Sequence, residues 1–237
     1  MSDSIPLLRE MLPLRNEEEA RGLMRFFKTG KGEYGEGDQF LGIRVPVTRA
    51  IVKRVWRETT IQDLEECIQS QWHEVRLAAL LTLIQIFKHN KKNPQTQQAC
   101  IDFYLRHTSR INNWDLVDLS CYELLGTWLL DKDRTILYKL AQHGHLWEQR
   151  IAIVSTMQFL RHGETHETYA IADLLLQHPH DLIHKAVGWL LREAGKRNEK
   201  ELVHYLDVHH LNMPRTMLRY AVERLTNEQQ HRYIRKK

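Results

Sequence analysis

The sequence HEVRLAAL at residues 73–80 decides the expected fold, because a closely related run, EQRIAIV, returns at residues 148–154. The arginines of the two runs lie 74 residues apart. A helix beginning at Trp114 falls midway between them, and another around Lys185 comes one step later. The chain therefore repeats about every 37 residues, an interval typical of stacked helical hairpins.

Helices are expected along the whole chain, because glycine and proline are few and apolar residues recur with a 3.6-residue period. The predicted helices cover residues 5–12, 17–28, 47–58, 61–70, 73–89, 95–107, 114–130, 134–143, 147–161, 166–177, 181–197, 199–206, 215–224 and 228–235. A single hairpin cannot bury its apolar face, so neighbours stack into a curved solenoid. The run VRLAA resembles the second helix of a HEAT repeat. We therefore expect an all-α, right-handed solenoid of HEAT-like hairpins with a concave basic face, forming a single domain over residues 1–237.

Composition narrows the class of protein further. The formal net charge of +4 is mild, and no apolar run approaches the length of a membrane span. The N-terminal sequence places charged residues too early for a signal peptide, so we expect a cytoplasmic protein. Cys67, Cys100 and Cys121 lack CxxC spacing, which predicts reduced, packed thiols. The fourteen histidines form no HExxH motif, so no metal site is expected.

A glycine-rich loop at residues 29–39 interrupts the helical pattern. Gly30, Gly32 and Gly35 formally match GxGxxG. The segment follows a helix, and no βαβ unit surrounds it, which argues against a dinucleotide site. We expect a mobile surface loop, which could also reach a ligand.

The run NNWDLVD at residues 112–118 is the first candidate for chemistry. At the start of a helix, Trp114 and Asp118 share one face, and that face is otherwise apolar. Burial of an ionised carboxylate is costly unless something compensates for it. Asp115 needs no such explanation, because an acid in the first turn suits the helix dipole. The pattern therefore singles out Asp118, turned towards an apolar surface beside the indole.

Arg150 lies on a helix that is apolar nearly all round, and a buried arginine needs a partner. One interpretation is a structural ion pair with a neighbouring acid, such as Asp118. The other is a phosphate clamp beside a catalytic carboxylate, since a guanidinium group matches phosphate geometry. Spacing alone leaves both open.

A cationic stripe lies on the predicted helix 181–197. With 100° between successive residues, Lys185, Trp189, Arg192 and Lys196 fall on one narrow face. Three cations around an indole suit a sugar–phosphate backbone. A solvated charged face with one exposed tryptophan is the alternative.

Five sequence blocks, in order along nearly the whole chain, resemble the AlkD-like DNA alkylation repair glycosylases. The blocks are FLGIRVP at 40–46, NWDLVD at 113–118, LWEQR at 146–150, KAVGWLLRE at 185–193 and MPRTMLRY at 213–220. The resemblance implies an α-solenoid of HEAT-like repeats that holds duplex DNA in its concave face. It also implies hydrolysis of the N-glycosidic bond of N3- and N7-alkylated purines, without a metal or redox cofactor.

The same resemblance suggests roles for single residues. Asp118 matches the catalytic carboxylate, Trp114 the aromatic residue beside the sugar of the lesion, and Arg150 the arginine at the neighbouring phosphate. Trp189 matches a second aromatic residue of the pocket. Lys185, Arg192 and Lys196 are then expected to contact the DNA backbone.

One position departs from the family pattern. Where the family has a tyrosine after an arginine in the second helix, this chain has Phe26 after Arg25, so the ring is kept and the hydroxyl is lost. We expect a monomer that acts on double-stranded DNA containing alkylated bases. The alternative is a non-catalytic HEAT-like scaffold that binds nucleic acid or protein, in which Asp118 would be structural only.

Overall fold

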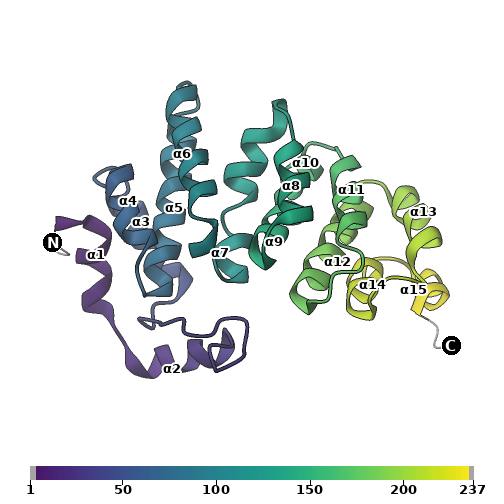
Figure 1. Ribbon diagram of the computed structural model, residues 1–237, viewed down its shortest axis with the longest axis horizontal. Helices are drawn as coiled ribbons and strands as arrows, with labels where there is room; N and C mark the ends of the chain where they lie inside the picture. Colours follow the sequence, from purple (N-terminus) through teal and green to yellow (C-terminus); the bar gives the residue numbers. More distant parts are fainter. Residues whose placement is uncertain (1–3, 235–237) are drawn as a thin grey trace. The chain divides into compact units, whose positions relative to one another are not determined.

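The computed structural model describes residues 4–234, and over that range the chain forms helices and no strands (Figure 1). One isolated bridge, between Gln39 and Trp72, is the only β-type pairing in the described part. No helix within these residues has both the length and the apolar character that a membrane span requires. The expected all-α, helical-repeat architecture is confirmed.

The helices form two compact units, which meet in sequence between Ser120 and Cys121. The first unit contains α1 (Pro6–Met11), η2 (Leu12–Leu14), α2 (Glu17–Phe26), α3 (Val45–Val55), α4 (Ile61–Ile68), α5 (His73–His89), α6 (Pro94–Arg106), η3 (Thr108–Arg110) and α7 (Trp114–Asp118). Its centre is α5, which packs against α1, α3, α4, α6 and α7.

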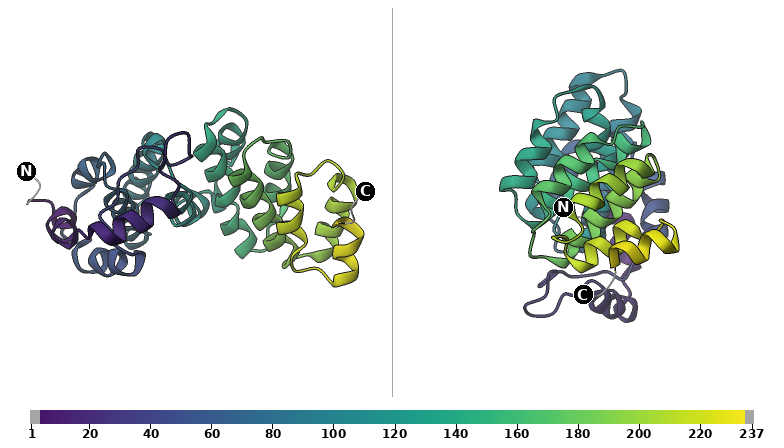
Figure 2. Two further views of the ribbon diagram at one scale, coloured as in Figure 1. Left: turned by 90° about the horizontal axis from the view of Figure 1, so that it is seen from below. Right: turned by 90° about the vertical axis from the view of Figure 1, so that its right-hand side faces the viewer.

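The second unit is built around α12 in the same way. It contains η4 (Tyr122–Gly126), η5 (Leu129–Asp131), α8 (Thr135–His143), α9 (Leu146–Ser155), α10 (Met157–Arg161), α11 (His166–Leu174), α12 (Asp181–Gly195), α13 (Glu199–His209), α14 (Arg215–Val222) and α15 (Asn227–Ile234). Helix α12 packs against α9, α10, α11, α13 and α14. The views in Figure 2 show the helices of each unit side by side. The prediction of a single domain is not tested by this grouping.

The buried polar start of α5 holds the sequence block FLGIRVP, residues 40–46, in place. The carboxylate of Glu74 accepts hydrogen bonds from the backbone N–H groups of Leu41, Gly42 and Ile43, at 2.8–3.0 Å. Gly42 has φ +89°, and a Cβ atom there would lie 2.2 Å from the carbonyl oxygen of Asn16. Only glycine allows this turn, so the block fixes the chain between α2 and α3 onto α5.

The predicted helix 114–130 is wrong as a continuous helix. The α-helix ends at Asp118, and a π-helix and a short 3-10 helix follow it. The hydroxyl of Ser120 donates to the carbonyl group of Leu116, at 2.5 Å. Such bonds from a serine to the carbonyl group four residues earlier compete with the helical ladder and bend it.

The predicted helix 147–161 is also divided, because α9 ends at Ser155 and α10 begins at Met157. The hydroxyl of Thr156 donates to the carbonyl group of Ile153, at 2.7 Å, which replaces a ladder bond at the break. The other predicted helices occur with ends shifted by a few residues, and residue 235 of the last one lies outside the described part.

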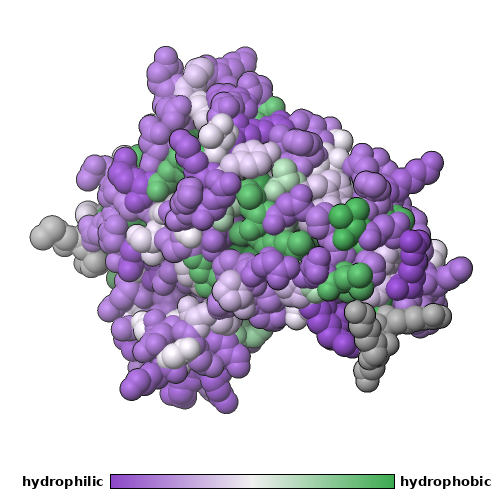
Figure 3. Space-filling model, turned by 45° about the vertical axis from the view of Figure 1, so that its right-hand side comes forward, coloured by the Kyte–Doolittle hydropathy of each residue, from purple (hydrophilic) through white to green (hydrophobic). Residues whose placement is uncertain are grey.

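The cysteines and the surface follow the expected pattern. Cys67, Cys100 and Cys121 are all free thiols and buried, which confirms the prediction. Burial raises the pKa of Cys67 to about 12 and that of Cys100 to about 11. The face shown in Figure 3 is mainly hydrophilic, with several apolar patches. The large apolar side chains exposed in residues 4–234 are Leu14, Met24, Phe26, Val47, Leu174, Val208, Leu211 and Tyr220.

Candidate functional site

Trp114 and Asp118 occupy the two ends of α7, and both are half-buried. The side chain of Asn113 caps the helix by accepting a hydrogen bond from the Trp114 N–H, at 2.9 Å. Residues four apart on a helix lie on the same face, so the carboxylate and the indole are neighbours. The structure therefore keeps this predicted pair together in the first unit.

An aromatic cluster around Phe27 holds the indole of Trp114. The rings of Phe27 and Trp114 stack, with centroids 5.4 Å apart, and Phe27 also stacks on Phe40 at 5.1 Å. Phe26 meets Trp114 edge-on at 6.0 Å, and it is 62% exposed. Aromatic pairs in these geometries are attractive. The cluster packs two predicted site residues, Phe26 and Trp114, against each other, and most of the Phe26 side chain remains in solvent.

The buried carboxylate of α7 is Asp115, so the expectation that burial singles out Asp118 is wrong. Asp115 is 4% exposed, whereas Asp118 is only half-buried. An oxygen of Asp115 lies 2.9 Å from Nε2 of His73, and Nδ1 of the same ring lies 2.8 Å from Asp38. Two carboxylates on one imidazole require both ring nitrogens to donate, which is the protonated form.

The electrostatics of this cluster favour that charged imidazole. Burial lowers the pKa of His73, but attraction and hydrogen bonding to Asp115, followed by those to Asp38, outweigh burial and raise it to about 9. Burial raises the pKa of Asp38, but the hydrogen bond with His73 and the attraction of Arg76 have the larger effect. The pKa of Asp38 is therefore lower than usual. The imidazole is therefore charged at neutral pH.

Arg76 completes the buried charge network, which we define as Asp38, His73, Arg76 and Asp115. Its guanidinium group forms an ion pair with Asp38 and donates to the side chain of Asn112, at 3.1 Å. Asn112 and Asp115 both lie at the start of α7, so the network joins α5 to the helix that carries Trp114 and Asp118.

The same network fixes the end of the glycine-rich loop. Asp38 is buried, and the backbone N–H of His73 donates to the carbonyl group of Gln39, at 2.8 Å. Turns with backbone hydrogen bonds run through the loop, from Gly30 to Asp38. The predicted surface loop is therefore anchored to α5 at its C-terminal end, while most of residues 29–37 are exposed.

In the second unit, Arg150 is buried on α9 and donates to the carbonyl group of Leu182, in the first turn of α12. The two helices pack directly against each other. Arg150 thus lies beside the helix that carries the predicted cationic stripe. Its charge also contributes to the lowered pKa of His180, after burial of that ring.

The stripe on α12 forms as predicted, but each of its cations has an acidic partner. Lys185 pairs with Asp181 at 2.8 Å, and Lys196 pairs with Glu193 at 2.6 Å. Arg192 pairs with Glu223, the residue directly after α14, and lies 3.6 Å from Glu193. Trp189 is half-buried among these charges. The stripe is a network of ion pairs around an indole, exposed at the two lysines and mostly buried at Arg192.

Sequence reasoning did not find His73 or Asp38. A signal was present, because HEVR places an imidazole, a carboxylate and a guanidinium group at the start of an apolar helix. Three polar groups at positions that must be buried predict a network, although its partners come from a loop and from α7. Within residues 4–234, no group of three or more His, Cys, Asp and Glu side chains is arranged to hold a metal ion.

Taken together, these features define a helical-repeat protein that presents an indole and a carboxylate on a short helix in one unit, and an arginine with a cationic stripe in the other. The family model described as DNA alkylation repair enzyme matches residues 7–225. The chain belongs to this family.

A solved structure supports the same fold. It is described as a predicted DNA alkylation repair enzyme from Enterococcus faecalis, and its TM-score to this chain is 0.71 at 18% identity. The match covers 90% of this chain and 97% of that one. No curated protein matches the sequence.

Proposed function

We propose that this protein is a monofunctional DNA glycosylase that hydrolyses the N-glycosidic bond of N3- and N7-alkylated purines in duplex DNA. The observation that carries the proposal is the half-buried Asp118 on α7, one turn from an indole held by stacked rings, in a chain of the DNA alkylation repair family. Solvent reaches the carboxylate of Asp118 in part, whereas Asp115 is buried against His73.

The chemistry of the lesion suits a single carboxylate. Alkylation at N3 or N7 makes the purine cationic, so it leaves as a neutral base with the bonding electron pair and needs little help from a general acid. Positive charge then develops on the deoxyribose, as in glycoside hydrolysis. In the proposal Asp118 stabilises that charge and orients the water that attacks C1′, and this water gives up a proton to the surrounding solvent as the new C–O bond forms. The face of Trp114 favours the same cationic sugar.

The other predicted residues bind the DNA backbone in this proposal. Arg150 is buried and bonded to Leu182, so in this proposal its guanidinium group turns outward when DNA binds and takes a phosphate group in a bidentate manner. Lys185, Arg192 and Lys196 exchange their acidic partners for phosphate groups, and Trp189 packs on the sugar. Surface ion pairs contribute little stability, so such an exchange has a small cost.

The decisive test is release of free base from methylated duplex DNA by the wild type and by Asp118→Asn. The amide keeps the shape of the side chain and removes its charge, so we expect release of 7-methylguanine to be lost while affinity for the duplex stays the same or rises. Asp115→Asn is a poor control because it alters the buried network, so Asp131→Asn, an exposed carboxylate on η5, serves instead. Normal base release by the Asp118 variant would remove this carboxylate from the mechanism.

Arg150 separates the two interpretations left open by the sequence. Arg150→Lys keeps the charge but loses bidentate geometry. If Arg150 contacts phosphate, this variant should bind DNA more weakly at a temperature where the wild type and the variant are both folded. A lower unfolding midpoint with unchanged affinity for DNA would show that the side chain is structural, bonded to Leu182 only for packing.

The alternative is a non-catalytic scaffold of the same fold. Both functions predict salt-dependent binding to unmodified duplex, because contacts with the phosphate backbone are generic. Only the glycosylase releases free alkylated base. Absence of released base from several alkylated substrates, with binding intact, would favour the scaffold.

A further inference from the structure

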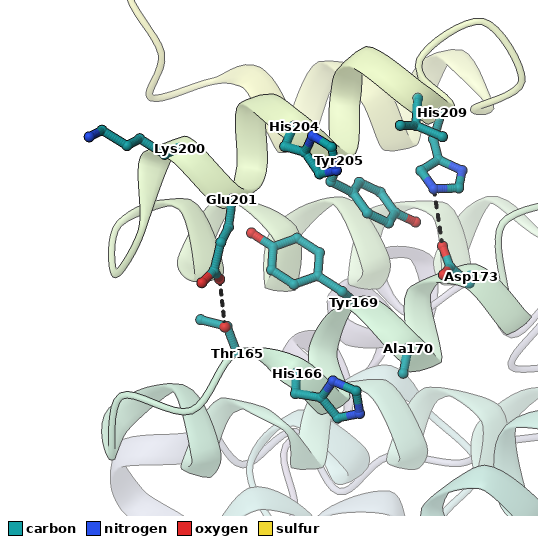
Figure 4. A pocket seen from close by; sticks show the side chains of 11 residues that line it. Thr165, His166, Tyr169, Ala170, Asp173, Lys200, Glu201, His204, Tyr205 and His209 are labelled. Atoms are coloured by element: carbon teal, nitrogen blue, oxygen red, sulfur yellow. Dashed lines mark hydrogen bonds and ion pairs between the residues drawn. The ribbon is translucent and has the colours of Figure 1, made fainter.

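A groove of about 680 Å³ lies between α11 and α13 of the second unit (Figure 4). It is formed by the facing sides of two helices that carry none of the residues assigned to DNA above. The groove has aromatic rings in its middle and a carboxylate towards each end, and these features together suggest a ligand.

Each end of the groove is marked by a contact between the two helices. At one end the hydroxyl of Thr165 donates to Glu201, at 2.6 Å. At the other end Nε2 of His209 lies 3.6 Å from Asp173. The two helices run in the same direction, and eight residues at 1.5 Å per residue separate Glu201 from His209, about 12 Å along the axis. The two carboxylates are therefore well apart, at opposite ends.

The middle of the groove is aromatic. The rings of Tyr169 and Tyr205 lie 5.1 Å apart, and Tyr205 stacks on His209 at 4.3 Å. In Figure 4 the hydroxyl of Tyr169 lies towards Glu201, and the hydroxyl of Tyr205 lies towards Asp173 and His209. Each carboxylate thus has a phenol beside it.

Both phenol oxygens are buried. The hydroxyl of Tyr169 completes no hydrogen bond with any group in residues 4–234, whereas the hydroxyl of Tyr205 is directed at the carboxylate of Asp173 and still has lone pairs to accept a hydrogen bond. Tyr205 as a whole is 6% exposed. Burial and the nearby carboxylates, Glu201 for Tyr169 and Asp173 for Tyr205, raise the pKa of both hydroxyls. They remain neutral phenols that can accept a hydrogen bond. A buried polar group without a partner costs free energy, so a ligand that pairs with it gains that amount.

We propose that this groove binds a linear aliphatic polyamine, with one ammonium group at the Asp173–Tyr205 end and another at the Glu201–Tyr169 end. Each ammonium group donates to a carboxylate and to a phenol oxygen, and hydrogen bonds between charged partners are among the stronger ones. The methylene chain lies against the aromatic rings, whose faces also attract the cations. This site is independent of the proposed glycosylase activity.

The charge of the lining agrees with a cationic ligand. The one lysine of the groove, Lys200, extends away from the rings in Figure 4. The remaining titratable groups besides the two carboxylates and the two phenols are His166, His204 and His209.

Calorimetric titration of the full chain, without DNA, tests the proposal. The probes are spermidine, 1,4-diaminobutane and butylamine, the last being a monoamine with the same four carbons as the diamine. We expect saturable binding with one site for the two polyamines, and affinity for butylamine lower by about tenfold or more, because it reaches one carboxylate only. Equal affinity for butylamine and for the diamine, or no binding at millimolar concentrations, would overturn the proposal.

Substitutions then locate the site. Asp173→Asn and Glu201→Gln should each lower the affinity for spermidine by about tenfold, and Tyr205→Phe should lower it by a few-fold with the ring retained. Glu228→Gln, an exposed carboxylate on α15, removes the same charge outside the groove and should change affinity less than twofold. Equal effects of all three carboxylate changes would mean diffuse attraction and refute the site. If a groove variant fails to fold by circular dichroism, the amine series on the wild type still decides.

Discussion

The buried charge network of the first unit and the charged stripe of the second use similar side chains in opposite ways. In the network, Asp38, His73 and Arg76 are each less than 6% exposed, and they hold the start of α7 through Asp115 and Asn112. On α12, the lysines keep more than 40% of their side-chain surface in solvent. Burial makes every member of the network depend on its partners, whereas the stripe can change partners at little cost.

This contrast suggests different roles for the two regions. The buried network ties the start of α7, the helix that carries Trp114 and Asp118, to α5, and the catalytic role proposed for Asp118 requires such a fixed position. Ion pairs at the surface are weak and can be replaced by phosphate groups of a ligand. If burial separates the two regions, substitutions in the buried network should lower stability far more than substitutions in the stripe.

The largest effect is expected from His73→Phe. Phenylalanine keeps the ring contacts with Phe27 and Phe40 but leaves the two buried carboxylates without the imidazole that joins them. Removing one partner of a buried ion pair costs about 3–5 kcal/mol. Denaturant unfolding, followed by circular dichroism, should show a loss of this size.

The matched change in the stripe is Lys196→Ala. Its partner Glu193 remains near Arg192, and the lysine is exposed, so the free energy of unfolding should change by less than about 1 kcal/mol. Similar losses for the His73 and Lys196 variants would show that burial does not separate the two regions.

The second prediction concerns pH. Because the pKa of folded His73 is about 9, above the usual 6.5, the protonated imidazole stabilises the folded state. That contribution is complete below pH 6.5, declines as pH rises towards 9 and is lost above it. The pKa of Asp38 is lowered, so its contribution is present above the usual carboxyl range and is lost as pH falls through the lowered value. The unfolding midpoint of the wild type, measured from pH 6 to 10, should therefore decrease as the pH rises.

His73→Gln identifies the group responsible for the alkaline loss. Glutamine can still hydrogen-bond but does not titrate, so its unfolding midpoint should be lower and nearly flat between pH 6.5 and 9. The charged groups that face the ring are Asp38, Asp115 and, through Asp38, Arg76. A wild-type midpoint that stays constant up to pH 10 would mean that His73 is neutral in the fold.

The sequence predicted the helices well because apolar periodicity is a local property. It predicted both ends of α5 correctly, because polar turns on each side of an apolar helix mark where the helix begins and ends. It failed where a hydroxyl competes for a carbonyl group, at Ser120 and at Thr156. Such competition depends on the rotamer of a single side chain, which periodicity does not specify.

The candidate site was predicted in part for a similar reason. Helical spacing placed Trp114 with Asp118, and Lys185 with Lys196, on common faces. It could not show that Asp115 turns inward, because its partner His73 lies 42 residues away and Asp38 belongs to a loop. Contacts between distant segments depend on the packing of α5 against α7, which the pattern of one helix does not contain.

The third prediction concerns the salt dependence of DNA binding. If the stripe contacts phosphate groups, each of Lys185→Ala, Arg192→Ala and Lys196→Ala should reduce the slope of log affinity against log salt by about 0.9 on duplex DNA. Thermal stability should stay nearly unchanged for the two lysine variants. Lys139→Ala, an exposed lysine on α8, is the control and should leave the slope as it is. Four equal changes would point to general attraction by net charge.

The smallest effect is expected from Phe26→Tyr, which restores the hydroxyl that the family pattern has at this position. Phe26 is 62% exposed, so the tyrosine should leave stability unchanged. If the hydroxyl reaches a phosphate group, one added hydrogen bond contributes about 0.5–1.5 kcal/mol, a few-fold gain in affinity for duplex DNA in a fluorescence anisotropy titration. Phe26→Leu removes the edge contact with Trp114 and should slow base release without that gain. Unchanged affinity of the tyrosine variant, together with slower release by the leucine variant, would show that Phe26 acts only by holding the indole of Trp114.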